Sequence, residues 1–437
     1  MLLSFRFANH RSFRDEHQLN LTPVYESGAP GADPELAAVP VVGIFGANAS
    51  GKSNVISAFQ YLCYMAGTSD RESEPGFGPR RQPFRLDPEV AREPSSYAVD
   101  LVIKGVRHTY GFILDDDQIL EEWLYAYPFK KKRVVFERTG QDFHWGEESS
   151  RSNIKKLADI TSHAALFLSV TSRFEARESS DNESDETSTV LHDTYSWLWQ
   201  EISYADASRG PLPYRYPSLL ESSELRRAFV DILRAADIGL QDVFIRPVEL
   251  DEAIEASKGI SPSERSRILA RIGGNRLQFL HRGAVGNVTL GMEDESSGTL
   301  RLFELASLAL SVLERGSVLM VDEIDASLHP LLTASLIRIF RSTTVNRRRA
   351  QLVFTTHDAT LLGSIDGEDV LERDQIWFTS KRDDGSSELF PLAEFKPRRE
   401  GENRQKRYLN GSYGAIPELS MRLFEQAVIS RTDASAE

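Results

Sequence analysis

One short stretch of the chain has the residue types and spacing of a phosphate-binding loop. It reads Gly46-Ala47-Asn48-Ala49-Ser50-Gly51-Lys52-Ser53 and is followed by Asn54. Glycines let backbone N–H groups turn toward a phosphate, and the N-terminus of a following helix adds partial positive charge. A lysine at this spacing reaches the β- and γ-phosphates, and the next hydroxyl binds magnesium. The stretch therefore predicts a site for ATP and Mg²⁺, with Lys52 on the phosphates and Ser53 on the metal.

The residues on either side of this loop agree with that interpretation. The apolar run 39–45 precedes it and predicts a buried strand. After the loop, apolar side chains recur at the spacing of one helical face: Val55, Ala58, Phe59, Leu62 and Met65. The alternative is a glycine-rich turn with a chance lysine. Because strand, loop and helix follow in the required order, the phosphate-binding interpretation is favoured.

A second group of residues complements the loop much later in the chain. The apolar run 318–321 predicts a buried strand, and Asp322 and Glu323 follow it directly. In a phosphate-loop enzyme the first such acid helps to hold magnesium, and the second can orient the attacking water and accept its proton. Many buried strands end in acids, so the assignment depends on the presence of the loop at 46–53.

A serine- and glycine-rich turn precedes a helix predicted over 300–313. It reads Ser296-Ser297-Gly298-Thr299. Such a turn offers N–H groups, hydroxyls and a helix dipole to an anion. The same residues could instead serve as an ordinary helix N-cap. The neighbouring motifs favour the anion site.

Taken together, these motifs resemble the ABC-type ATPase heads of SMC, RecF and OLD proteins. The resemblance implies that residues 296–299 form the signature that binds the γ-phosphate held by an opposite subunit, although Glu295 and Ser297 replace the usual leucine and one glycine. It implies that Asp325 lies in the D-loop and that His357, after a strand predicted over 351–355, is the switch histidine near the γ-phosphate.

The same resemblance implies two further nucleotide-site residues. Gln82 takes the place of the Q-loop residue at the metal. Arg11 takes the place of a nucleotide contact near the N-terminus, with a role at the sheet edge as the alternative.

Two more patterns resemble stand-alone bacterial ATPases of the OLD/RecF-like group, which include RloA-, AbiL- and PARIS-type phage-defence ATPases. They are Asn-x-Arg-Ser-Phe at 9–13 and a late Tyr-Gly-x-x-Pro at 413–417. The resemblance implies a homodimer or higher homo-oligomer through ATP-sandwiched heads. It also implies a separately encoded effector, for which a nuclease is the expected class.

The pattern of elements predicts an α/β protein: a P-loop NTPase with an ABC-type head and a mostly helical insertion. Alternation over 97–138 predicts an antiparallel sheet, and α/β alternation after 299 predicts a parallel, helix-covered sheet. The acidic, serine-rich residues 178–189 predict a surface loop. We divide the chain into an N-terminal lobe, an insertion and a C-terminal lobe, at 1–145, 146–285 and 286–437.

Composition limits the other functional classes. The 437 residues carry a net charge of −14 and one cysteine, Cys63, so neither a general nucleic-acid coat nor a cysteine-based metal site is expected. No apolar run approaches the roughly 18 residues of a membrane span, and the N-terminus lacks a signal-peptide pattern. We therefore expect a cytoplasmic protein without a membrane partner. The basic runs 130–133, 347–349 and 396–407 lack interleaved aromatics and are interpreted as solvated surface, which leaves contact with nucleic acid open.

The sequence thus predicts an enzyme, a Mg²⁺-dependent ATPase that dimerises around ATP and regulates an effector in phage defence. Two alternatives remain open. One is a RecF-like ATPase of DNA repair or DNA binding, and the other is a scaffold that assembles on ATP with little turnover.

Overall fold

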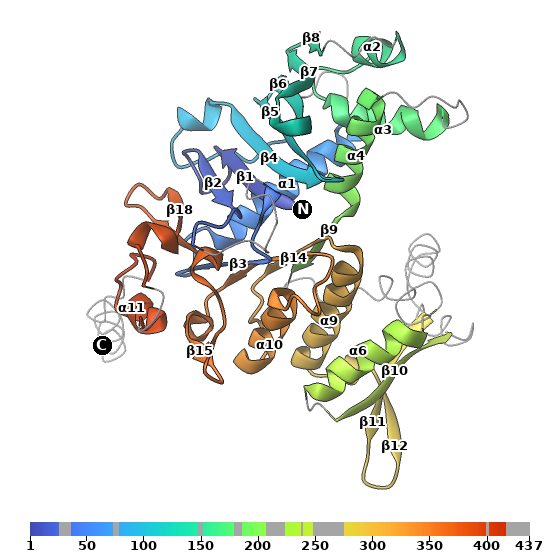
Figure 1. The fold of residues 1–437 in the computed structure, drawn as a ribbon, viewed down its shortest axis with the longest axis vertical. Coiled ribbons are helices and arrows are strands. Elements are labelled where there is room, and N and C mark those ends of the chain that lie inside the picture. The colour runs from blue at the N-terminus through green and yellow to red at the C-terminus, as the bar shows by residue number, and fades with distance from the viewer. Residues whose placement is uncertain are drawn as a thin grey trace, which may run out of the picture.

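The computed structural model describes residues 1–25, 36–72, 78–146, 152–178, 186–206, 223–236, 239–247, 275–398 and 402–416. Within them the chain forms four layers (Figure 1): an antiparallel sheet, a helical layer containing α1 (Lys52–Glu72), a central mostly parallel sheet, and a second helical layer. The second helical layer consists of α9 (Ser297–Arg315) and α10 (Pro330–Arg341). These layers confirm the α/β class.

The central sheet has six strands in the order β18-β17-β3-β14-β13-β9. Its strands are β3 (Val41–Gly46), β9 (Ile202–Asp206), β13 (Val318–Asp322), β14 (Gln351–Thr356), β17 (Ile376–Lys381) and β18 (Ser387–Pro391). All neighbours pair in parallel except β17 and β18. The strands predicted from apolar runs around 41, 318 and 351 are confirmed. Parallel pairing brings the carboxyl ends of β3, β13 and β14 to one edge.

Both faces of this sheet are covered, and alternate side chains along a strand pack into different cores. On β3, Val42 and Ile44 pack toward α1, whereas Val41 and Phe45 pack in a core shared with α9 and α10. Burial on both faces explains why these strands read as continuous apolar runs in the sequence.

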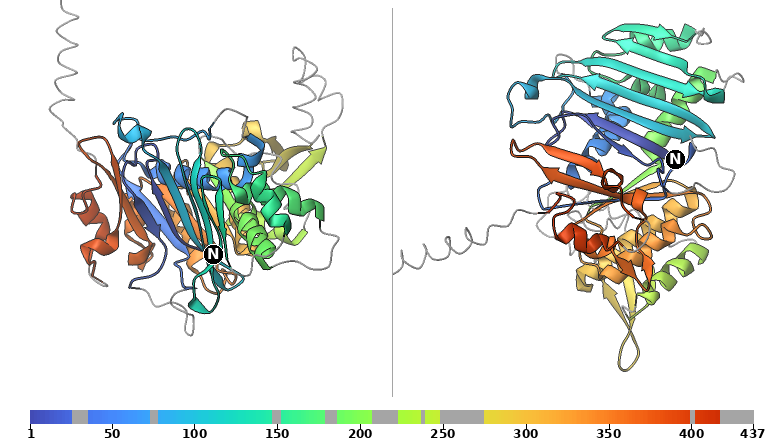
Figure 2. Two further views of the ribbon diagram at one scale, coloured as in Figure 1. Left: turned by 90° about the horizontal axis from the view of Figure 1, so that it is seen from above. Right: turned by 60° about the vertical axis from the view of Figure 1, so that its left-hand side comes forward.

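The antiparallel sheet has seven strands in the order β2-β1-β4-β5-β6-β7-β8 (Figure 2, right). The strands are β1 (Leu2–Ala8), β2 (His17–Asn20), β4 (Ser95–Ile103), β5 (Val106–Leu114), β6 (Ile119–Tyr127), β7 (Arg133–Thr139) and β8 (Asp142–Trp145). The sheet predicted over 97–138 is confirmed and is extended by the N-terminal strands. One face packs against α1 in a shared core.

The described residues of the segment 146–285 are mostly helical, as expected, and they also include strands. The segment contains α2 (Ser152–Asp159), α3 (Phe167–Glu178), α4 (Glu186–Gln200), α6 (Ser223–Ala235), β10 (Leu240–Pro247) and β11 (Asn275–Arg282), besides β9. The strand β9 pairs in parallel with β13 and so belongs to the central sheet. The strands β10, β11 and β12 (Asn287–Gly291) form a separate sheet, and Phe229 of α6 and Phe279 of β11 pack on Phe303 of α9. The three-way division of the chain stays a prediction.

A few short elements complete the described chain. They are β15 (Ser364–Ile365), β16 (Glu368–Asp369) and α11 (Arg404–Leu409). Of the surface loop predicted at 178–189, both ends are helical, in α3 and α4, and residues 179–185 lie outside the described residues, as does Pro417 of the late motif. Within the described ranges, no helix has the length and apolarity needed to cross a membrane.

A buried ion pair fixes the start of α3 to the antiparallel sheet. Glu122 on β6 and Arg138 on β7 lie 3.5 Å apart, and neither side chain is exposed. The Glu122 carboxylate accepts the backbone N–H groups of Phe167 and Leu168 at 2.6 and 3.0 Å, while Arg138 donates to the Ala165 carbonyl at 2.8 Å. Burial raises the pKa of Glu122, and the charge of Arg138 opposes that shift.

We expect Arg138→Met to destabilise the protein by about 3 kcal/mol or more at pH 8, because Glu122 is left as an unpaired buried charge. Without the arginine the pKa of Glu122 rises further, so the deficit is full at high pH and shrinks as pH falls through that pKa. Urea unfolding at pH 8 and pH 5 measures both effects. The double variant Glu122→Gln/Arg138→Met should recover part of the loss, and a deficit that is the same at both pH values would contradict this account.

Candidate functional site

The loop between β3 and α1 is held in a shape that only its glycines permit. A Cβ on Gly46 would lie 2.5 Å from the carbonyl oxygen of Thr379 on β17. Gly51 has φ +111°, and a Cβ there would lie 2.6 Å from Ser387 Oγ on β18. Close packing against the β17–β18 hairpin therefore requires a glycine at position 46, and the positive φ adds a conformational requirement at position 51.

The Lys52 side chain folds back across this loop. Its Nζ donates to the carbonyl oxygens of Gly46 and Ala47, both at 2.9 Å, and the residue is 8 % exposed. Burial lowers the pKa of Lys52, and the negative charges of Glu323, Asp325 and Asp322 oppose that shift. An ammonium in this position, largely removed from water, is complementary to an anion within the loop.

The carboxyl ends of β13 and β14 bring a carboxylate to the start of α1. Asp322 Oδ1 accepts a hydrogen bond from Ser53 Oγ at 3.0 Å and a second from Thr355 Oγ1 at 2.5 Å. Thr355 Oγ1 in turn accepts the backbone N–H of Glu323 at 2.8 Å. The predicted metal ligands Ser53 and Asp322 thus meet, and buried Thr355 positions both acids. A hydroxyl and a carboxylate side by side fit Mg²⁺, which prefers oxygen ligands and keeps other positions for water and phosphate.

Thr355 was not identified as a functional residue from the sequence. It stands two residues before His357, at the end of a strand expected beside the one that carries Asp322. This position in the sequence is the signal from which Thr355 could have been identified.

Glu323 has a backbone conformation that is unusual for its residue type. Its φ is +52°, in the left-handed region, and the residue is exposed. Strained non-glycine residues of this kind concentrate at functional sites. No hydrogen bond or ion pair to its carboxylate is found in the part of the chain that the structure describes, so this group is available to a water molecule.

His357 lies against the loop that follows Glu323. Its Nδ1 is 3.2 Å from Asp325 Oδ2; the His357 side chain is 60 % exposed, whereas that of Asp325 is 6 % exposed. The structure thus pairs the two residues assigned as switch histidine and D-loop acid. Their roles toward the γ-phosphate stay predictions.

The turn at 296–299 caps α9, as the alternative interpretation expected. Ser296 Oγ accepts the backbone N–H of Thr299 at 3.0 Å and lies 2.8 Å from the Thr299 hydroxyl. Capping engages Ser296 and leaves Ser297 exposed in the first turn. A Cβ on Gly298 would lie 2.8 Å from the Ser327 carbonyl oxygen, so this glycine allows the loop after Glu323 to approach closely.

Arg301 joins the same helix to the acids and was not identified from the sequence. Its Nη2 donates to the carbonyl oxygens of Asp322 and Glu323 at 3.0 and 3.2 Å, and its Nη1 bonds to Glu304 Oε2 at 2.9 Å. Arg301 therefore links α9 directly to the backbone that carries both acids.

Gln82 is engaged by Arg11 rather than by the predicted metal ligands. Arg11 Nε donates to Gln82 Oε1 at 2.5 Å, and the Arg11 backbone N–H donates to the Gln82 carbonyl at 2.7 Å. The guanidinium also reaches Asn54 Oδ1 at 3.5 Å, on the first turn of α1. Both residues line a cavity of 410 Å³ beside this turn. No contact within the described residues brings Gln82 to Ser53 or Asp322.

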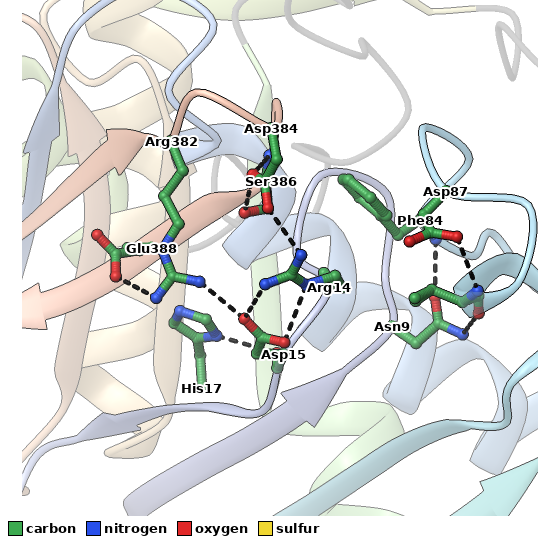
Figure 3. A network of polar contacts seen from close by, with 11 residues as sticks. Asn9, Arg14, Asp15, His17, Phe84, Asp87, Arg382, Asp384, Ser386 and Glu388 are labelled. Carbon is green, nitrogen blue, oxygen red and sulfur yellow. Dashed lines mark hydrogen bonds and ion pairs between the residues drawn. The ribbon is translucent and has the colours of Figure 1, made fainter.

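The Asn-x-Arg-Ser-Phe turn that carries Arg11 is fixed from two sides (Figure 3). On one side, the Asn9 amide donates to the carbonyls of Val90 and Glu93 at 2.8 and 2.7 Å and accepts the N–H of Phe84 at 2.8 Å. Asn9 thereby holds the segment that follows Gln82.

On the other side, charged groups tie the turn to the β17–β18 hairpin. Arg14 donates to Asp384 at 2.7 Å, and Arg382 donates to Asp15 at 2.8 Å (Figure 3). The motif thus positions Arg11, and the two residues that follow it brace the hairpin that packs on the phosphate loop.

The family described as "AAA domain, putative AbiEii toxin, Type IV TA system" matches residues 41–363, which include the loop, both acids and His357. Among solved structures, an SMC head domain from Thermotoga maritima is 12 % identical to this chain, with a TM-score of 0.40. The match covers 89 % of this chain and 98 % of the SMC head domain. An SMC head bound to the C-winged helix domain of ScpA is 13 % identical to this chain, with a TM-score of 0.42. That match covers 90 % of this chain and 99 % of the SMC head. No match was found among curated proteins.

We expect Lys52→Ala to weaken ATP binding by at least about 100-fold, because charge-assisted hydrogen bonds to phosphate are lost. Isothermal titration calorimetry with ATP and Mg²⁺ measures the affinity. The matched control is Lys155→Ala, which removes an exposed lysine on α2. Unchanged affinity in Lys52→Ala would contradict the assignment of the loop.

We expect Thr355→Val to lower kcat for ATP by about 10-fold with little change in KM, because the hydroxyl positions both acids and does not itself contact the nucleotide. Steady-state kinetics separate the two constants. Thr355→Ser, which keeps the hydroxyl, should restore most of the rate. A wild-type kcat in Thr355→Val would show that the Thr355 hydroxyl is not needed to position the acids.

Proposed function

The chain belongs to this AAA domain family, and from that premise we propose that it is an ATPase head that closes on a second copy of itself around ATP and Mg²⁺. One observation carries the proposal: Lys52, Ser53, Asp322 and Thr355 meet at one edge of the central sheet. This edge combines a cation for phosphate with oxygen ligands for a metal.

Each residue has a distinct task in the proposed reaction. Lys52 binds the β- and γ-phosphates, and Ser53 and Asp322 hold the metal. Bound Mg²⁺ neutralises phosphate charge. The exposed carboxylate of Glu323 orients the attacking water and accepts its proton, and Thr355 fixes the backbone from which Glu323 projects.

The proposed dimer follows from the position of the signature turn. Within one chain, Ser296 is engaged in capping and Gly298 faces the loop at Ser327. The exposed Ser297 and the N–H groups of Ser297 and Gly298, which have no hydrogen-bond partner among the described residues, suit an anion presented from outside the chain. In the proposal that anion is the γ-phosphate bound by the second copy, and Arg301 transmits its arrival to Asp322 and Glu323.

The biological setting is proposed from the resemblance to RloA-, AbiL- and PARIS-type ATPases. On that basis the chain acts in the bacterial cytoplasm beside a separately encoded effector, with a nuclease as the expected class, in defence against phage. Closure and reopening of the heads would then be the signal to that effector. The alternatives of a RecF-like DNA-binding ATPase and of an ATP-assembled scaffold differ from it in partner and in turnover.

We expect Glu323→Gln to retain ATP binding, to hydrolyse ATP at least about 100-fold more slowly and to accumulate as a closed dimer, because the proton acceptor is lost while the phosphate contacts remain. Size-exclusion chromatography with light scattering, with and without ATP, reports the dimer. The control is Glu314→Gln, an exposed acid near the other end of α9.

The two halves of this proposal can fail separately. Hydrolysis at the wild-type rate in Glu323→Gln would remove the catalytic role of Glu323. A variant that binds ATP, fails to hydrolyse it and stays monomeric would refute the dimer. Negligible turnover of the wild type with ATP-dependent assembly would favour the scaffold.

A further inference from the structure

The strand β6 carries a row of aromatic side chains on one face of the antiparallel sheet. Leu124 and Ala126 point into the core. The intervening positions hold three half-buried aromatic side chains: Trp123, Tyr125 and Tyr127. Alternate residues of an antiparallel strand share a face and lie about 6.8 Å apart. A Cβ on Gly111 would lie 2.4 Å from the ring of Trp123, so that ring lies directly over the neighbouring strand β5.

The turn after β6 places a fourth aromatic ring in solvent. Phe129 comes at the next alternate position and is 97 % exposed. Its backbone is left-handed, with φ +54° and ψ +34°, and Lys130 follows with φ +62°. This conformation costs free energy in a non-glycine residue, and an exposed ring recovers none of it by burial. The Lys131 N–H donates to the Pro128 carbonyl at 3.2 Å and closes this hairpin turn, which presents the Phe129 ring to solvent.

Cations lie over and beside these rings. Lys132 Nζ is 3.6 Å from the centre of the Tyr125 ring, and Arg107 Cζ is 5.1 Å from the centre of the Tyr127 ring. Arg107 lies opposite Tyr127 in the β5–β6 register, so both face the same side. Lys131, next in the turn, is exposed and has no ion-pair partner within the described ranges.

Acidic groups also face this region and balance part of its charge. Glu137 accepts the Tyr125 hydroxyl at 2.7 Å and lies 3.7 Å from Lys132. Arg107 lies 3.2 Å from the largely buried Asp100. Arg133 pairs with Glu186 at 2.5 Å, but it lies opposite Ala126 and so is on the other face of the sheet. Exposed ion pairs are weak and screened by salt, so a polyanion can compete with these acids for the cations.

We infer that this aromatic face, comprising Trp123, Tyr125, Tyr127 and Phe129 with Arg107, Lys131 and Lys132, binds single-stranded nucleic acid. A base would stack on the exposed ring of Phe129, and the backbone phosphates would lie along the cations. Aromatic rings at regular spacing, interleaved with cations, form the stacking platform that single strands require. On a chain of net charge −14, such a contact depends on a local group of cations rather than on the charge of the whole surface.

Two other partners fit the same residues less well. A membrane would need a wider apolar surface than one exposed phenylalanine. An acidic peptide would use the cations but has no use for an aromatic row. The inference does not depend on the nucleotide role of Lys52, since the two sites share no residue.

Fluorescence anisotropy with a labelled oligothymidylate of about 20 nucleotides tests the inference. We expect binding that weakens as salt rises. Phe129→Leu should weaken it by about 10-fold, because the stacking surface is lost, whereas Phe129→Tyr should preserve it. Lys131→Glu should also weaken binding, and Lys155→Glu on α2 is the matched charge control.

Several outcomes would overturn the inference. Absence of oligonucleotide binding at low salt would do so, as would equal affinity in the Phe129→Leu and wild-type proteins. Tighter binding to phosphatidylserine vesicles, retained in Phe129→Leu, would instead identify a membrane surface. Lys52→Ala should keep oligonucleotide binding and Phe129→Leu should keep ATP turnover, so failure here is distinguishable from failure of the ATPase proposal.

Discussion

The position of one carboxylate, that of Asp322, determines the arrangement around it. Its Oδ1 accepts hydroxyl hydrogen bonds from Ser53, 269 residues earlier in the chain, and from Thr355 on the neighbouring strand. These contacts exist because β3, β14 and β13 are adjacent and parallel, so their carboxyl ends share an edge. Arg301 then connects this edge to the helix that starts at the signature turn. Hydrogen bonds thus connect Ser53 at the phosphate loop, the two acids and the N-terminal part of α9.

The part of this unit that could be predicted from the sequence is the part with local signals. The spacing of the glycines around Lys52 predicts positions that only glycine can occupy. The structure shows the reason, since Thr379 and Ser387 pack closely against the loop. The apolar runs before Gly46 and Asp322 reflect strands that are buried on both faces. Once a parallel sheet is inferred, the proximity of Ser53 and Asp322 follows without further information.

What could not be predicted depends on contacts between distant segments. The strand β9 is short and partly polar, so its sequence does not mark it as a buried strand. Its pairing with β13 places it in the central sheet. Gln82 has no local signal for its bond to Arg11. The basic run after Phe129 was interpreted as solvated surface because its aromatic partners belong to β6, where alternation reads only as a half-buried strand. The sequence period shows which residues share a face, but not which cations from a neighbouring strand or turn lie over it.

The central claim is that Lys52 and Ser297 of one chain serve different ATP molecules, so that each site is completed by a second copy. Complementation between two inactive variants tests it most directly: Lys52→Ala, which loses the phosphate loop, is mixed with Ser297→Glu, whose new charge repels the γ-phosphate. In a mixed dimer, one site combines the intact loop of one copy with the intact signature of the other. The account predicts that each variant alone fails to hydrolyse ATP and that the mixture regains hydrolysis. A mixture as inactive as its parents, or a Ser297→Glu protein with the wild-type rate on its own, would contradict it.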